Sequence, residues 1–164
     1  MAGLVPAIVA LGLVALAALL ATLGRTSPVE LAAERAAVSK MLAIATAVQT
    51  AHFIEEWATG FNVRFPALFG LGPIPLSVFV AFNLTWIILW IASIPLIRKA
   101  RQAAFFTAWF LAIAGVLNGI AHPVLAIRTG GYFPGLISSP VIGLAGLLLW
   151  QRLGVATSAS GARG

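Results

Sequence analysis

The sequence predicts an all-α fold, a polytopic membrane bundle of about five transmembrane helices. Hydrophobic residues make up 61% of the 164-residue chain and charged residues only 9%, whereas soluble domains carry roughly 25% charged residues. The mean hydropathy is +1.05. Apolar residues also gather in runs of about 18 or more, the length at which a helix crosses a bilayer. We therefore expect the lipid bilayer to be the partner of most of the surface.

Five apolar runs are predicted to span the membrane: Leu4 to Leu23, Met41 to Thr59, Leu76 to Ile97, Ala103 to Ile127, and Leu136 to Trp150. The first lacks the basic start of a signal peptide and is long for one, which indicates a retained helix. Ahead of the second, Ser27, Pro28 and Glu30 suit the N-cap, first helical and N3 positions of a helix. That polar helix is expected to continue into the second span without a break.

The connections between the spans are marked by composition. Gly60 to Pro75 is rich in Gly, Pro and Phe and predicts an irregular loop at the interface. Residues 130–135 form a second Gly-rich loop ahead of the last span. Residues 155–164 are rich in Ala and Ser and predict a disordered tail, so that residues 1–154 form a single transmembrane domain. We find no internal repeat.

Basic residues predict the orientation. Two of them, Arg64 and Arg128, lie on one predicted side, and the other side holds Arg25, Arg35, Lys40, Arg98, Lys99, Arg101, Arg152 and Arg163. The positive-inside rule places the richer side in the cytoplasm. In a multi-pass protein of the cell's inner membrane, the N-terminus is then outside and the C-terminus is in the cytoplasm. The net charge of +6 does not indicate nucleic-acid binding, because the basic residues form no stripe. The absence of cysteine excludes disulfides and thiolate metal sites.

Four ionisable residues fall inside predicted spans: His52, Glu55, Glu56 and His122. An acidic group in the bilayer costs roughly 2.5 kcal/mol or more, so such residues usually face the bundle interior and have a function. Placing two adjacent carboxylates in the bilayer merely to join helices would also cost a large free energy. We therefore expect these four residues to form one site.

Helix geometry supports a common site. At 100° per residue, Glu55 and Glu56 lie on either side of His52 on one face of the second span. Pro123 is expected to bend the fourth span just after the histidine there. Polar residues of the third and fourth spans reach the same level in the outer half of the membrane: Asn83, Asn118 and His122.

Three motifs in this order resemble a known family. His52-Phe53-Ile54-Glu55-Glu56 is His-x-x-Glu-Glu, Asn118 to His122 is Asn-x-x-x-His, and Tyr132 to Ser138 is Tyr-x-Pro-Gly-x-x-Thr/Ser. Over residues 41–140 the chain resembles the bacterial membrane family with the HXXEE motif. That family is known by its motif, with a metal-dependent hydrolase and a transporter both suggested. The resemblance implies one shared site and supplies no reaction.

A looser resemblance concerns His52, Glu56 and Trp57. They are similar to the His…Glu-Gly-Trp stretch of emopamil-binding-protein-type isomerases, which are five-helix membrane enzymes that work by protonation without a metal. Here the Gly is missing and the spacing to the Trp differs by one residue.

The motifs allow a metal-dependent enzyme, which we take as the leading hypothesis. His-x-x-Glu-Glu resembles an inverted zinc motif, so His52, Glu56 and His122 would hold Zn or Fe with an open coordination position. Glu55 would act as the general base toward water in a hydrolysis. The residues expected to contact a lipophilic substrate or to cap the site are Asn83, Asn118, Trp57, Tyr132 and Ser138.

Two further hypotheses use the same residues. In a metal-free isomerase or cyclase, crowding in a low dielectric would keep one of Glu55 and Glu56 protonated, as an acid, with His52 or His122 as base. A small transporter or ion-binding protein is the other alternative, although carriers usually rest on repeated halves. An accessory subunit without catalytic activity is also consistent with the composition.

Overall fold

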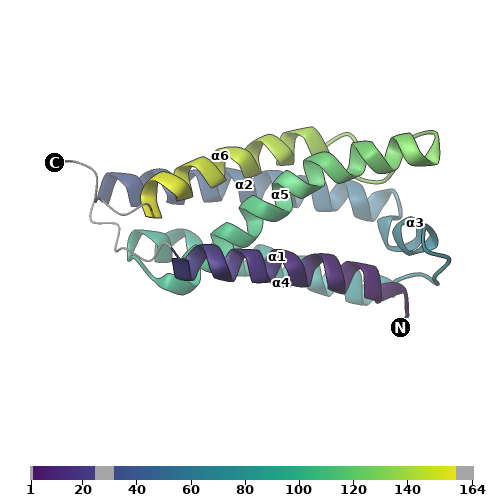
Figure 1. The fold of residues 1–164 in the computed structure, drawn as a ribbon, viewed down its shortest axis with the longest axis horizontal. Helices are drawn as coiled ribbons and strands as arrows, with labels where there is room; N and C mark the ends of the chain where they lie inside the picture. Colours follow the sequence, from purple (N-terminus) through teal and green to yellow (C-terminus); the bar gives the residue numbers. More distant parts are fainter. Residues whose placement is uncertain (1, 25–31, 158–164) are drawn as a thin grey trace.

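The computed structural model describes residues 2–24 and 32–157, and this part of the chain is helical, with no strand (Figure 1). In chain order the elements are the 3₁₀ turn η1 (Ala2–Leu4), α1 (Val5–Gly24), α2 (Ala32–Ala58), α3 (Phe61–Ala67), α4 (Leu76–Arg98), α5 (Gln102–Thr129) and α6 (Ser139–Thr157). Five helices, α1, α2, α4, α5 and α6, are long and apolar enough to cross a membrane. The predicted all-α bundle with five candidate spans is confirmed.

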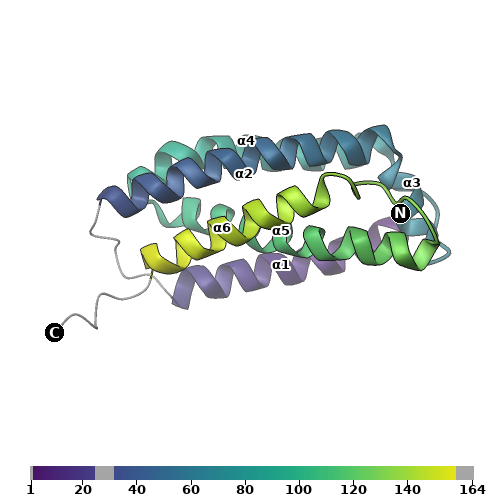
Figure 2. The same ribbon diagram turned by 90° about the horizontal axis from the view of Figure 1, so that it is seen from above.

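Helix α5 occupies the middle of the bundle. It packs against α6, α1 and α4, while α2 packs against α4 and α6. In Figure 1, α5 crosses obliquely from the level of α1 and α4 at its start to the level of α6 at its end. Seen from above, α2 and α4 lie along one edge and α1 along the opposite edge (Figure 2). The end of α2, the helix α3 and the connection from α5 to α6 therefore meet at one end of the bundle.

The surface of the bundle is apolar, as the sequence predicts for lipid contact. Large side chains such as Ile127, Ile88 and Leu13 are well exposed. The interior is close-packed instead, with Trp109 and Leu42 almost completely covered. In a soluble protein so much exposed apolar surface would mark an interaction site; here the bilayer is its natural solvent.

Helices α5 and α6 pack backbone to backbone. Gly115 and Gly119 on α5 face Gly143 and Gly146 on α6. A Cβ added to Gly119 would lie 2.7 Å from the Cα of Gly143, and one added to Gly146 would lie 2.8 Å from backbone atoms of α5. Small residues allow transmembrane helices to approach this closely. The contact fixes His122, on α5, relative to the start of α6.

The segment from Gly60 to Pro75 was expected to be an irregular loop, and this was wrong in part because it contains α3. Gly60 adopts a left-handed conformation, φ 80°, between α2 and α3, which glycine allows without strain. The side-chain amide of Asn62 donates to the carbonyl of Ile74 at 3.0 Å, and the Ile74 N–H donates to the Asn62 carbonyl at 2.8 Å. A seven-residue helix that contains Pro66 and depends on such contacts leaves no periodic pattern in the sequence.

Helix α6 begins and ends later than predicted, at Ser139 and Thr157. Its start is delayed because the backbone N–H groups of Ile137 and Ser138 donate to the side chain of Glu55 and hold these residues in a turn. No proline interrupts the final apolar turns, so the helix continues through the first residues of the predicted tail.

Two predictions fall wholly or partly outside the described residues. The helix start at Ser27, Pro28 and Glu30 lies there, and so do residues 158–164 of the predicted tail. From Ala32 onward, α2 is one unbroken helix through to Ala58, as expected for the polar helix that continues into the second span.

The two ends of the bundle differ in charge. Arg64 on α3 and Arg128 near the end of α5 lie at the end that contains α3. The other end holds the remaining basic residues of the described chain, Arg35, Lys40, Arg98, Lys99, Arg101 and Arg152.

This asymmetry leads to a topological prediction. The positive-inside rule keeps the basic end of the bundle in the cytoplasm. After Gly164, a fused reporter that works in the cytoplasm should therefore be active, and one that works only outside it should be inactive. Paired alkaline phosphatase and fluorescent-protein fusions measure this directly, and a fusion in the α5–α6 connection serves as the opposite-side control. Phosphatase activity from the C-terminal fusion would reverse the orientation.

Candidate functional site

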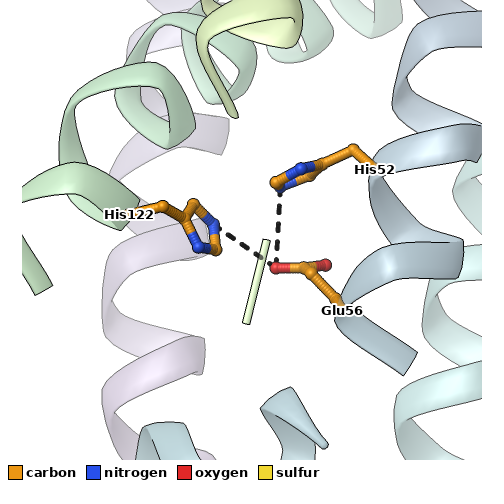
Figure 3. Close-up of side chains that lie close together, drawn as sticks. All are labelled: His52, Glu56 and His122. Atoms are coloured by element: carbon orange, nitrogen blue, oxygen red, sulfur yellow. Dashed lines mark ion pairs between the residues drawn. The ribbon is translucent and has the colours of Figure 1, made fainter. Parts of the chain in front are cut away.

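Three of the predicted site residues converge inside the bundle. His52 and Glu56 lie one turn apart on α2, and His122 approaches them from α5 (Figure 3). Their exposed fractions are 0%, 7% and 2%. One ligand atom from each lies within 4.8 Å of the others. Glu56 Oε1 is 3.7 Å from His52 Nε2 and 3.5 Å from His122 Nε2. We call these three residues the triad.

The orientation of His122 is set by the connection between α5 and α6. Its Nδ1 lies 2.6 Å from the carbonyl oxygen of Pro134. A carbonyl can only accept, so Nδ1 carries the proton and donates. In a neutral imidazole this leaves Nε2 with its lone pair, directed at Glu56. The rings of Phe61 and Phe133 cover His122, with centroids 5.7 and 6.2 Å away.

The orientation of His52 follows from a proton count. Its Nδ1 lies 2.8 Å from Ser138 Oγ, and Ser138 Oγ donates its only proton to a carboxylate oxygen of Glu55. Ser138 must therefore accept from His52, which places the imidazole proton on Nδ1. The buried Nε2 then bears a lone pair, and it has no hydrogen-bond partner among the described residues.

Glu55 lies beside the triad and is not part of it. Its Oε1 accepts from Tyr132 OH at 2.6 Å and from the Ile137 N–H at 3.0 Å. Its Oε2 accepts from the Ser138 N–H at 2.8 Å and from the Ser138 hydroxyl. Partial burial of Tyr132 raises the pKa of its phenol above the ordinary value, and the hydrogen bond to Glu55 raises it further. Tyr132 therefore remains a donor at neutral pH.

Sequence reasoning assigned no role to Gly135. Its φ is 87°, in the left-handed region that favours glycine. A Cβ at this position would lie 2.6 Å from His122 Cε1, 2.7 Å from His122 Nδ1 and 2.9 Å from His52 Cε1. Gly135 thus lies against both imidazoles, and nothing larger fits there. The Tyr-x-Pro-Gly motif contained the signal, because a Pro-Gly pair marks a tight turn.

The remaining predicted residues do not take part in the hydrogen bonds described above. Asn118 is half-buried on α5, one turn before His122. The Asn83 amide donates to the carbonyl of Phe79 on its own helix at 3.0 Å. Trp57 is 50% exposed. Pro123 lies within α5, which continues to Thr129.

The two Glu56–histidine distances are closer to the spacing of ligands around a metal ion than to that of a shared proton. Two lone pairs and a carboxylate oxygen converge, an arrangement that needs a cation or a proton between them. A proton shared by Glu56 and a histidine would require a hydrogen bond of about 2.7 Å, shorter than the observed 3.5 and 3.7 Å. Ligands about 2.1 Å from a common tetrahedral ion are themselves roughly 3.4 Å apart. The two distances to Glu56 are close to that value, and all three ligand atoms lie within 4.8 Å of one another.

Comparisons with known proteins identify a family and no activity. No curated protein and no solved structure matches the chain, so the resemblance to emopamil-binding-protein-type isomerases gains no support. Residues 43–149, which include all three members of the triad and the Glu55 contacts, match the model of a family described as a protein of unknown function with HXXEE motif. The chain belongs to this HXXEE family.

Proposed function

We propose that the triad holds a divalent metal ion, Zn or Fe, and that the protein is a membrane-embedded, metal-dependent hydrolase of the inner membrane. The observation that carries this proposal is the convergence of His52 Nε2, His122 Nε2 and Glu56 Oε1, each buried and each an acceptor. Each histidine donates a hydrogen bond from its other ring nitrogen, Nδ1, to an oxygen of the α5–α6 connection, that of Ser138 or Pro134. That pattern of outer partners is typical of metal-ligating histidines.

The donor set indicates which chemistry the site would support. Two imidazoles and one carboxylate leave an open position on zinc or on non-haem iron. A metal bound there polarises a carbonyl and lowers the pKa of water. His52, Glu56 and His122 would hold the ion, and the rings of Phe61 and Phe133 beside His122 would limit access of bulk water.

The surroundings favour a lipophilic substrate. The triad lies between α2 and α5, two candidate spans, near the end of the bundle that contains α3. The outer face of α5 beside His122 is apolar, with Ile120 and Val124 exposed. A substrate dissolved in the bilayer would meet this face first.

Metal analysis of the purified protein tests the proposal. Wild-type protein in detergent, loaded with Zn²⁺ or Fe²⁺ and desalted, should retain about one ion per chain. His52→Ala and His122→Ala should each lose it, because each removes one of three ligands. Asn83→Ala, which removes a polar group from a neighbouring span, is the matched control and should retain the ion. Circular dichroism confirms that each variant keeps its helices.

Hydrolysis needs a separate measurement. Turnover of a panel of lipophilic esters and amides in proteoliposomes should stop with a chelator and return with added metal. A wild-type protein that retains no ion after loading would contradict the metal site. A loaded protein that turns over none of the panel would contradict the hydrolase.

A further inference from the structure

We infer that Glu55 is a positioning residue, which acts through Ser138 on His52 and thereby sets the affinity of the triad for its ion. The inference rests on the proposed metal site and differs from the general-base role that the sequence suggested. Three observations carry it: the hydrogen bonds that Glu55 accepts, the direction of the Ser138 hydroxyl, and the attachment of Glu55 to the segment between α5 and α6.

Glu55 has no acceptor capacity left for a water molecule. A carboxylate offers about four lone-pair sites. Four donors occupy them: Tyr132 OH, the Ile137 N–H, the Ser138 N–H and the Ser138 hydroxyl. A general base must accept a proton from the reacting group. Glu55 would have to break one of these bonds first, so its geometry suits a fixed anchor.

The direction of the Ser138 hydroxyl connects Glu55 to His52. As long as Glu55 only accepts, Ser138 must give it the hydroxyl proton and accept from His52 Nδ1. The His52 tautomer with a bare Nε2 is therefore specified by a residue whose hydrogen bonds go to Tyr132, Ile137 and Ser138 and which is not one of the three ligands. An amide at position 55 could donate to Ser138 Oγ. The hydroxyl would then be free to donate to Nδ1, which would place the imidazole proton on Nε2 and block the ligand.

The same carboxylate also holds the segment that orients His122. Glu55 binds this segment at Tyr132 and again at Ile137 and Ser138. Between these points lie Pro134 and Gly135, whose contacts with His122 fix its ring. Glu55 is thus placed to stabilise both histidines at once. Its loss should weaken metal binding even though all three ligands remain.

Metal affinity, measured by competition with a chromogenic chelator, tests the inference. Glu55→Gln should weaken Zn²⁺ or Co²⁺ binding about 10- to 100-fold, the usual effect of removing an outer partner of a ligating histidine. Glu34→Gln makes the same change at the other end of α2 and should leave the affinity unchanged. Ser138→Ala should weaken binding in the same way. Ser138→Thr, which keeps the hydroxyl, should restore it.

A tautomer measurement separates positioning from general loss of structure. In metal-free protein, imidazole ¹⁵N shifts should show His52 protonated at Nδ1 in the wild type and at Nε2, wholly or in part, in Glu55→Gln. If Glu55→Gln binds metal as tightly as wild type, the inference is wrong while the proposed metal site stands. If the wild type itself binds no metal, the proposed function fails first.

Discussion

Glu56→Gln should remove the ion from the protein while leaving the helices intact. The substitution keeps the size of the side chain and replaces the one anionic ligand of the triad with a neutral amide. Structural zinc sites with four ligands have apparent binding energies of about 10–16 kcal/mol, or roughly 3 kcal/mol per ligand. The affinity should therefore fall at least about 100-fold.

Elemental analysis after desalting and chelator competition measure this loss. Glu34→Gln, on the same helix and far from the triad, is the control and should retain the ion. Activity on any substrate of the wild type should fall together with metal content. Should Glu56→Gln keep a full complement of metal and lose only turnover, Glu56 would be an acid or base and not a ligand. The metal-free isomerase hypothesis would then become the leading one.

Gly135→Ala is expected to damage the site from outside the triad. Its Cβ would lie within 2.9 Å of atoms of both His52 and His122, closer than carbon atoms approach without a shift of their neighbours. The left-handed φ adds roughly 1–2 kcal/mol of strain, and forcing a methyl group into a packed site typically costs about 1–3 kcal/mol. Both imidazoles should move, and metal binding should be lost or strongly weakened.

The chain contains a matched control for this substitution. Gly130 also has a positive φ, 73°, but a Cβ there would meet no atom within 4 Å. Gly130→Ala therefore carries the backbone strain without the steric contact. Thermal unfolding should show a loss of stability in both variants, and the larger loss in Gly135→Ala because of its added steric contact. Chelator competition should show a loss of metal affinity in Gly135→Ala alone. Equal affinities in the two variants would mean that Gly135 does not constrain the imidazoles.

Much of the fold could be predicted from the sequence because a lipid bilayer, as the expected solvent, restricts the structures that a chain can adopt. In a bilayer every backbone polar group must be satisfied within its own segment, so a long apolar run is a helix. The five candidate spans follow from this rule alone. The grouping of His52, Glu56 and His122 followed from a similar argument, because ionisable groups avoid lipid and the helix repeat places two of them on one face.

The parts that escaped prediction depend on contacts between distant segments. The role of Gly135 depends on a turn that comes against two rings from different helices. The later start of α6 depends on the donation of two N–H groups to Glu55, more than 80 residues earlier in the chain. The partner of a polar group in a loop is not encoded in local periodicity, so the sequence marked Glu55 as a candidate site residue without showing what it binds.

The glycine contact between α5 and α6 has a consequence for how the protein folds. Since the two backbones touch at Gly119 and Gly143, these helices pack as one unit that carries His122 together with the segment holding its ring. Helix α2 brings His52 and Glu56. In lipid no hydrophobic force draws helices together, so an ion shared between α2 and this unit would cross-link the bundle. Metal binding and the association of these helices would then be coupled in one equilibrium.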